Sequence, residues 1–354
     1  MSVLIIAEAG VNHNGEKDKA FALVDAAAAA GADAVKFQTY KTEDLASMSV
    51  PKADYQKRST DSNETQFEML KKLELPESWH FELKLYAENK GITFISTAFD
   101  IKSLSFLEKL GLPFYKVPSG EITNAPLLKA FARTGKEIIL STGMATLGEV
   151  EQALAILAWG FLCDKEPESL DQIWQHWSVQ DARKSIREKV SLLHCTSQYP
   201  TPLSEVNLKA MDTLSSAFGL PVGYSDHTEG LLIPLAAVSR GATIIEKHFT
   251  LDRQLPGPDH RASLEPDELK EMVTQIRSLE QALGDGYKAP QPSEFDSRTS
   301  ARQNLVAKQD MAKGSLFTFE SLGTARTGNG ISALHYWDNI NTPATKNYKA
   351  GEAL

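Results

Sequence analysis

Short apolar runs alternate with longer amphipathic stretches along the first 285 residues. Eight of these runs have the β-branched, turn-bounded character of buried parallel strands. They are residues 3–9, 34–39, 93–98, 114–117, 137–141, 190–196, 221–225 and 243–249. Helical patterns lie between the runs, and several end at glycine, as helices commonly do (Gly31, Gly111 and Gly241). Eight alternating units predict an α/β protein with a closed (β/α)8 TIM barrel rather than an open sheet.

The domain organisation follows from where the alternation stops. Residues 1–285 are predicted to form the barrel. Residues 286–300 are rich in Pro and Ser and are predicted to be a linker. Residues 301–354 contain short strand-like runs and turns, which predicts a small β-rich domain.

Two stretches interrupt the barrel pattern. Residues 40–78 make a long polar connection after the second strand, and such a loop in a barrel is expected to form a lid or a wall of the site. Residues 160–188 are inserted before the sixth strand. The aromatic side chains of this insertion, including Trp174 and Trp177, are expected to pack against the barrel rather than to serve catalysis.

Composition narrows the class of protein. The 354 residues suit one barrel of about 250 residues with an appendage. The formal net charge of −9 argues against a general nucleic-acid binder but permits anionic small substrates. Two cysteines, Cys163 and Cys195, are too few for a disulfide-stapled fold. The sequence shows neither a signal peptide nor a membrane-spanning run, so the expected location is the cytoplasm.

Polar side chains gather at the predicted strand ends, where TIM barrels build their active sites. Lys36 and Lys116 stand between apolar neighbours, and lysines seldom lie in buried strands without an anion to meet. Phosphate is one such anion, and serine hydroxyls stand at neighbouring strand ends: Ser119, Ser141 and Ser225. We therefore expect a phosphate-bearing substrate; a salt bridge to a barrel carboxylate is the alternative for each lysine.

Two histidines, His227 and His248, end neighbouring strands. Neutral imidazoles at adjacent strand ends can bind one divalent ion and leave positions for water and a substrate oxygen. The pair therefore predicts a metal site. Because a ligating imidazole must be neutral, activity is expected to fall as the pH drops through the titration of these histidines.

Several ordered motifs resemble one known family along almost the whole chain. They are IIAEAGVNHNG, GADAVKFQTY, FISTAFD, YKVPSGEITN, ILSTGM, LLHCTSQYPTP, GYSDHT, EKHFTLDRQLPGPDH and RTGNG. Together they resemble the sialic acid synthases, a family of N-acetylneuraminate synthases and N,N'-diacetyllegionaminate synthases. The resemblance implies a cytoplasmic transferase that condenses phosphoenolpyruvate with N-acetylmannosamine and releases phosphate. The alternative acceptor is 2,4-diacetamido-2,4,6-trideoxymannose, which gives N,N'-diacetyllegionaminate.

The same resemblance implies a cofactor and an assembly. The cofactor is a divalent metal, Mn²⁺ first, with Mg²⁺ or Co²⁺ as alternatives. The C-terminal domain is expected to be antifreeze-like (SAF) and to cap the barrel of the partner in a domain-swapped homodimer. Neither nucleic acid nor membrane is an expected partner.

Site residues carry over position by position. The predicted catalytic residues are Glu8, Lys36, Lys116 and Glu246, and the predicted metal ligands are His227 and His248. The predicted substrate-binding residues are Gln38, Thr97, Ser119, Ser141, Ser197, Tyr199, Ser225, Asp259 and Arg326. Ser197 stands where some members have Asn, and Thr327 follows Arg326 where the family has Pro.

Two other functions compete with this interpretation. A Schiff-base aldolase on the same barrel would use Lys36 or Lys116 as the nucleophile. A non-enzymatic ice-binding or sugar-sensing protein would need no catalytic residues, and the intact set of lysines, glutamates and histidines counts against it.

Overall fold

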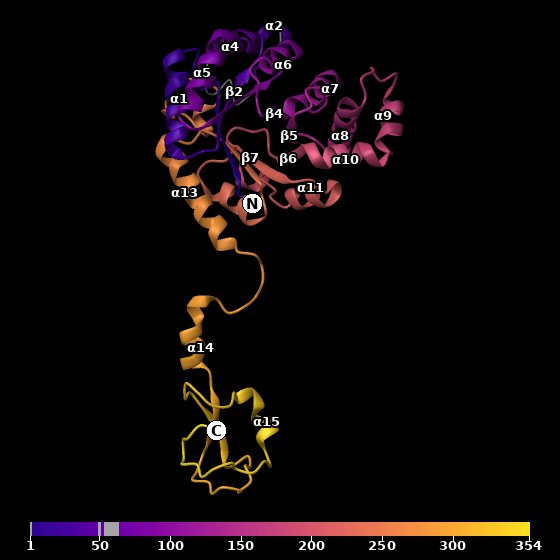
Figure 1. The fold of residues 1–354 in the computed structure, drawn as a ribbon. Coiled ribbons are helices and arrows are strands. Elements are labelled where there is room, and N and C mark those ends of the chain that lie inside the picture. The colour runs from indigo at the N-terminus through magenta and orange to yellow at the C-terminus, as the bar shows by residue number, and fades with distance from the viewer. Residues whose placement is uncertain (1, 49–50, 53–63) are drawn as a thin grey trace. The chain divides into compact units, whose positions relative to one another are not determined.

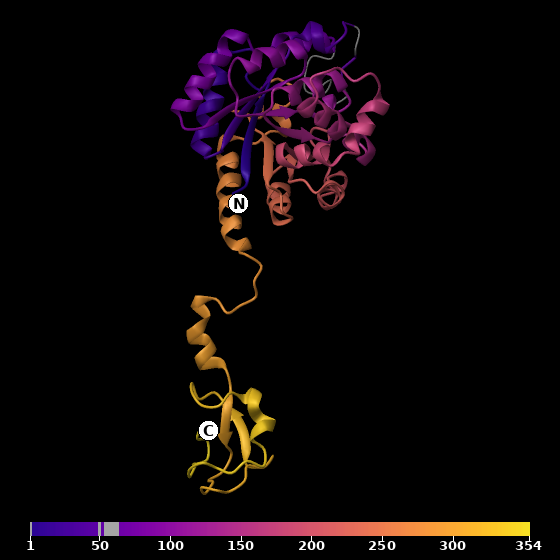
Figure 2. The ribbon, with the colours of Figure 1, turned by 45° about the vertical axis from the view of Figure 1, so that its right-hand side comes forward.

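The computed structural model describes residues 2–48, 51–52 and 64–354. It divides into two compact units, Met1–Gly284 and Asp285–Leu354, each with a hydrophobic core of its own. Figures 1 and 2 show the first unit as strands enclosed by helices, and the second as a small unit with two short paired strands. Among the described residues, no helix is long and apolar enough to cross a bilayer.

Eight parallel strands form the first unit, as the sequence predicts. They are β1 (Leu4–Gly10), β2 (Ala34–Thr39), β3 (Thr93–Ala98), β4 (Phe114–Val117), β5 (Glu137–Ser141), β6 (Val190–His194), β7 (Val222–Asp226) and β8 (Ile244–His248). Hydrogen-bonded pairs run in the order β3-β2-β1-β8-β7-β6-β5-β4. β3 and β4 lie against each other at the remaining seam, so the sheet is a nearly closed TIM barrel. The predicted fold class is confirmed, and each strand end lies within two residues of its predicted place.

Helices cover the outside of the strands (Figure 1). They are α1 (Lys17–Ala30), α2 (Thr42–Leu45), α4 (Gln66–Leu73), α5 (Glu77–Asn89), α6 (Ile101–Glu108), α7 (Ala125–Arg133), α8 (Leu147–Leu162), α9 (Leu170–Trp177), α10 (Gln180–Lys189), α11 (Ala210–Phe218), α12 (Leu232–Ser239) and α13 (Pro266–Leu283). α1 packs against both α5 and α13, and α8 packs against α7 and α10. Local signals fix the helix ends: Thr146 and Glu149 form a capping box on α8, and Gly31 ends α1 in the left-handed conformation.

The strand period of two residues builds the interior of the barrel in layers. One layer is apolar and closely packed: Ile6, Ala34, Ile95, Ile139, Leu193 and Ile244. Two residues further along β1, β2 and β8, on the same face, stand Glu8, Lys36 and Glu246. The apolar layer therefore forms a dry floor directly beneath a layer of charged side chains.

Both interruptions of the barrel pattern form helices within the described residues. The insertion 160–188 holds α9 and α10, and its Trp174 and Trp177 pack partly buried against the barrel core, as expected. Of the connection 40–78, residues 49–50 and 53–63 lie outside the described residues. Its described part supplies α2 and α4, whose apolar side chains line the pocket described below.

The second unit is small and contains an antiparallel pair, β9 (Asn304–Ala307) and β10 (Leu322–Ala325), with the short helix α15 (Tyr336–Asn339). Its core is made by Leu305, Met311, Phe317, Leu322 and Tyr348, with two alanines. The segment 286–300, expected to be a linker, contains most of α14 (Phe295–Ala301). The run EFDSRTSA lacks Gly and Pro, so nothing in it opposes a helix once Pro292 has opened the turn.

Gly223 on β7 permits close strand packing, because a Cβ there would lie 2.7 Å from Ile244 Cβ and 2.7 Å from Leu193 Cδ2. We expect Gly223→Ala to lower the free energy of unfolding by about 1–3 kcal/mol through overpacking, measured by urea denaturation. Gly148→Ala on α8 is the matched control, since its Cβ meets nothing closer than 3.9 Å. Equal stability of both variants would contradict the packing argument.

Candidate active site

One pocket of about 500 Å³ opens at the carboxyl ends of the strands. It brings together all of the predicted site residues that belong to the barrel unit: Glu8, Lys36, Gln38, Thr97, Lys116, Ser119, Ser141, Ser197, Tyr199, Ser225, His227, Glu246, His248 and Asp259. Arg326 is exposed in the second unit, directly after β10, and each unit is described by itself. Thr327 donates a hydrogen bond to the Asn329 carbonyl and accepts one from Asn304 at 2.9 Å, which ties down the loop where the family has Pro.

Four charged side chains alternate in sign at the base of the pocket, and all are nearly inaccessible to solvent. Lys36 Nζ lies 2.7 Å from Glu8 Oε2 and 3.6 Å from Glu246 Oε2. Lys116 Nζ lies 3.4 Å from Glu246 Oε1, which also accepts a hydrogen bond from Ser225 Oγ at 2.9 Å. The expected alternative for the lysines, a salt bridge to a barrel carboxylate, is therefore present. The four side chains have a formal charge of zero, so an arriving anion shares these lysines with the carboxylates.

The two carboxyl groups have opposite proton affinities. Burial raises the pKa of Glu8 to about 7, with Lys36 opposing the rise and Glu246 adding to it. Burial also acts to raise the pKa of Glu246, but Lys116 and Lys36 together lower it to about 2. Glu246 therefore stays ionised, while Glu8 can gain or lose a proton near neutral pH. Two carboxyl groups with separated pKa values are typical of an acid–base site.

The hydroxyl oxygens of Ser119 and Ser197 and the sulfur of Cys195 surround Gly143 in the same pocket as the lysines. A Cβ on Gly143 would lie 2.5 Å from Ser197 Oγ, 2.8 Å from Ser119 Oγ and 2.9 Å from Cys195 Sγ, so only glycine fits. The Gly143 N–H donates to Ser119 Oγ at 3.0 Å. Ser141 Oγ is buried in the same pocket with no hydrogen-bond partner among the described residues. Donors collected beside two lysines suit the oxygens of an anionic ligand.

The rings of His227 and His248 lie next to each other in the pocket, with centroids 5.5 Å apart. His227 Nδ1 lies 2.7 Å from the Thr196 carbonyl oxygen, which can only accept, so Nδ1 carries the proton and Nε2 keeps its lone pair. His248 Nδ1 is buried without a hydrogen-bond partner among the described residues, 4.0 Å from Asp259 Oδ2. Tyr199 packs over His227 with ring centroids 4.1 Å apart.

These donors fit a divalent ion with an open coordination sphere. An available imidazole nitrogen on His227 and an unpartnered buried one on His248 offer two protein ligands. Within the described ranges, no three His, Cys, Asp or Glu side chains converge to hold a metal.

The expected dependence of activity on histidine titration moves to lower pH. Burial lowers the pKa of His227 to about 4 and lowers that of His248 well below its usual value. Both imidazoles therefore stay neutral through the ordinary pH range. An acidic limb in the activity near neutral pH must come from another group.

Two parts of the site were not identified residue by residue from the sequence. The first is Cys195, whose Sγ lies 3.1 Å from Ser119 Oγ inside the pocket. Its place directly after the end of β6 was the available signal. The second is the apolar wall, made by Leu45 of α2, Met69, Leu70 and Leu73 of α4, and Phe99. A wall was expected from residues 40–78, but the residues that would form it were not identified. Four of them lie in that connection outside the quoted motifs, and Phe99 follows β3 within FISTAFD.

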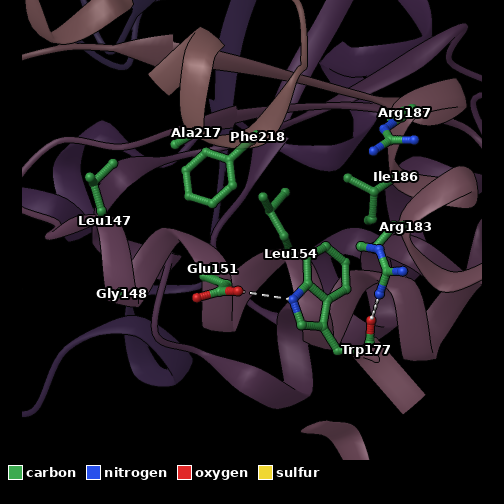
Figure 3. Close-up of a pocket in the computed structure, with 10 residues that line it drawn as sticks. All are labelled: Leu147, Gly148, Glu151, Leu154, Trp177, Arg183, Ile186, Arg187, Ala217 and Phe218. Atoms are coloured by element: carbon green, nitrogen blue, oxygen red, sulfur yellow. Dashed lines mark hydrogen bonds between the residues drawn. The ribbon is translucent and has the colours of Figure 1, made fainter. Parts of the chain in front are cut away.

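A second hollow lies on the outer wall between α8, α10 and α11 (Figure 3). Three of its polar groups contact one another or the backbone: Trp177 Nε1 donates to Glu151 at 3.1 Å, and Arg183 donates to the carbonyls of Trp177 and Ser178. The contacts of Trp177 seat the end of α9 on the barrel. The chemistry of the protein therefore gathers in the strand-end pocket.

The likeness to known proteins agrees with this site. The model of the NeuB family matches residues 23–288. The chain belongs to the NeuB family. It is 49% identical over 351 residues to N,N'-diacetyllegionaminic acid synthase of Campylobacter jejuni, covering 99% of this chain and 98% of that protein. It is 44% identical over 354 residues to the Legionella pneumophila protein of the same name, covering 100% and 94%.

A solved structure of N-acetylneuraminic acid synthetase from Leptospira borgpetersenii shares 35% identity with this NeuB-family chain, with a TM-score of 0.68 over 84% of this chain and 90% of that one. The predicted family and the predicted class of enzyme, a nonulosonic acid synthase, are confirmed by these relatives. Of the two acceptors expected from the sequence, the relatives favour the diacetamido sugar.

Glu8 predicts the pH dependence. If Glu8 acts as a base, it must be deprotonated, and its raised pKa of about 7 means that kcat/KM falls tenfold for each pH unit below about 7. The limb should vanish in Glu8→Gln along with most of the activity. In Gln38→Met it should move to higher pH, because the hydrogen bond from Gln38 Nε2 to Glu8 Oε1 at 3.2 Å lowers the pKa of Glu8. A limb unchanged in both variants would rule out Glu8 as its source.

Proposed function

We propose that this chain is a nonulosonic acid synthase that condenses phosphoenolpyruvate with 2,4-diacetamido-2,4,6-trideoxymannose, giving N,N'-diacetyllegionaminate and phosphate. The choice of acceptor rests on sequence identity to the two legionaminic acid synthases. They are 49% and 44% identical to this chain over almost its whole length, whereas the sialic acid synthetase is 35% identical. N-acetylmannosamine, the first acceptor expected from the sequence, takes second place.

The charged layer is proposed to bind phosphoenolpyruvate. Lys36 and Lys116 supply the positive charge, and burial lowers the pKa of Lys116, so an anion that compensates its charge is favoured there. Hydroxyl groups around the lysines supply hydrogen bonds: Thr97, Ser119, Ser141, Ser197 and Ser225. Their work is to position the enol and to hold the phosphate oxygens until the carbon–oxygen bond breaks.

Bond formation follows from this placement. The enol carbon of phosphoenolpyruvate attacks the aldehyde carbon of the open-chain sugar. The neighbouring carbon becomes cationic and takes up the oxygen of a water molecule. Glu8 accepts the proton of that water, since its carboxyl group changes protonation near neutral pH. The sugar oxygen, left as an alkoxide by the attack, takes up the proton that Glu8 received. The tetrahedral intermediate then expels phosphate toward the lysines, and the proton of its hydroxyl group leaves with the phosphate as the ketone forms.

His227 and His248 are proposed to hold a divalent ion, Mn²⁺ first. When bound, such an ion polarises a carbonyl oxygen and stabilises the negative charge that develops on it. The chain holds the two imidazoles neutral by burial, and His227 in one tautomer through the Thr196 carbonyl. Tyr199, Glu246 and Asp259 are proposed to contact the sugar, and Gln38 to orient Glu8.

The second unit is proposed to act as an antifreeze-like domain that caps the barrel of a partner subunit in a domain-swapped homodimer. Arg326 would then reach the N-acetyl group of the sugar. Its exposure and the hydrogen bonds that fix the adjacent Thr327 support this role.

The apolar wall supports the diacetamido acceptor. This sugar carries a methyl group where N-acetylmannosamine carries a hydroxymethyl group, and its second acetamido group adds another methyl. Each buried methyl or methylene group contributes about 0.8 kcal/mol. The described part of the wall offers Leu45, Met69, Leu70 and Phe99 as contacts.

Phosphate release from phosphoenolpyruvate with Mn²⁺ tests the proposal. We expect release with 2,4-diacetamido-2,4,6-trideoxymannose, and at least tenfold lower kcat/KM with N-acetylmannosamine, because loss of apolar contacts of this size costs about 10–200-fold. Preference for N-acetylmannosamine would make the chain an N-acetylneuraminate synthase. Release with neither sugar would overturn the proposed reaction.

Leu70→Gln tests the apolar wall. Leu70 is part of α4 and lines the pocket, so a polar side chain there should lower kcat/KM for the diacetamido sugar about tenfold. KM for phosphoenolpyruvate should change little. The control is Leu85→Gln on α5, where the leucine is 61% exposed and outside the pocket. Equal losses with both sugars would count against a role in acceptor choice.

A further inference from the structure

A second charged layer lies behind the pocket. Asp226 ends β7 and Lys247 stands in β8, one residue before His227 and His248 respectively. Their side chains have 0% exposure, and neither residue lines the pocket. Because side chains alternate along a strand, Lys247 points away from the face that carries Glu246 and His248, toward the helices.

The contacts of this pair connect Asp226 and Thr228, the two chain neighbours of His227, to Lys247. Asp226 and Lys247 are paired across the β7–β8 ladder, and Lys247 Nζ lies 2.6 Å from Asp226 Oδ2. Lys247 also donates to the Thr228 carbonyl. Asp226 Oδ1 accepts from the Thr228 N–H at 3.0 Å, and Asp226 Oδ2 accepts from Thr228 Oγ1 at 3.2 Å. The residues on both sides of His227 are thus tied to the residue that precedes His248.

Stability alone does not account for such a pair. Removing two charges from water is costly, and an apolar pair of similar volume is often as stable or more stable. What a directional pair adds is a fixed geometry. Side chains one shell behind metal ligands commonly set ligand orientation, and changing them typically weakens metal affinity 10–100-fold.

We propose that Asp226 and Lys247 are positioning residues that hold His227 and His248 at a fixed separation and orientation, so that both imidazoles bind one divalent ion. They contact neither substrate nor ion. This inference rests on the proposed function only in requiring that the two histidines bind a metal.

The pair also connects two residues whose backbones are otherwise fixed by separate hydrogen bonds. The His227 carbonyl accepts from the Thr201 N–H at 2.8 Å, and the His248 carbonyl accepts from the Leu264 N–H at 2.9 Å. These bonds fix each backbone separately. The Asp226–Lys247 contact joins one strand end to the other.

The test measures binding of Mn²⁺ to the metal-free full-length protein by electron paramagnetic resonance of the free ion, without substrates. The variant is Asp226→Asn with Lys247→Met, which keeps both side-chain volumes close and leaves no unpaired buried charge. We expect a folded protein whose dissociation constant for Mn²⁺ is raised 10–100-fold. At low Mn²⁺ its kcat should fall, and saturating Mn²⁺ should restore most of it.

Controls separate this inference from the metal proposal. Lys129→Met removes another buried lysine, outside the pocket, and should leave Mn²⁺ binding unchanged. Wild-type protein that binds no Mn²⁺ would overturn the metal proposal and this inference together. Wild-type binding with unchanged affinity in the folded double variant would overturn this inference alone. If the double variant does not fold, Thr228→Val is measured in the same way, since it removes the hydroxyl that donates to Asp226 Oδ2 and leaves the charged pair intact. Unchanged affinity there would equally overturn this inference.

Discussion

The rest of the site depends on the ion pairs that the buried Glu246 carboxylate forms with Lys36 and Lys116. Charges removed from water are tolerated only when they are compensated at short range. Lys36 and Lys116 compensate Glu246 and hold it ionised, with a pKa of about 2. An ionised Glu246 in turn adds to the rise in the pKa of Glu8. One carboxylate therefore keeps two lysines charged for an anionic substrate and helps its neighbour to become a proton carrier.

This arrangement works only on a rigid floor. The apolar layer beneath the charges leaves no room for water there, so the interactions between the charges are weakly screened. The layer consists of Ile6, Ala34, Ile95, Ile139, Leu193 and Ile244. The strand register that sets Lys36 beside Glu8 is fixed by close packing, and Gly143 admits the surrounding hydroxyls where any larger residue would collide with them. The positions of the charges are therefore properties of the barrel, and loops need only supply the wall that meets the sugar.

The sequence predicts this part of the molecule well for a physical reason. An apolar run that ends in Lys, His or Glu is unusual on a buried strand, and a barrel brings all such ends to one face. Strand-end placement indicated two lysines, three serines and two histidines, the family resemblance added the other seven, and all fourteen line one pocket. The pKa of His227 was beyond the same reasoning, since it depends on burial by Tyr199 and other segments distant in sequence. The residues of the apolar wall were not identified, because Leu and Met at helical spacing on α4 resemble any core-facing helix, and Phe99 directly after a strand resembles an ordinary core residue.

The role of Asp226 and Lys247 was also not predicted from the sequence. Both residues lie inside quoted motifs, GYSDHT and EKHFTLDRQLPGPDH, but the motifs do not show in which direction their side chains point. Alternation along β8 places Glu246 and His248 on one face and Lys247 on the other. A charged residue on the outer face of a barrel strand meets the helix layer, where solvent cannot stabilise it. The contact with Asp226 supplies the compensation that this position requires, and it falls between the two strand ends that carry the histidines. Period-two alternation thus accounts for both charged layers, one facing the ligand and one holding the residues that meet it.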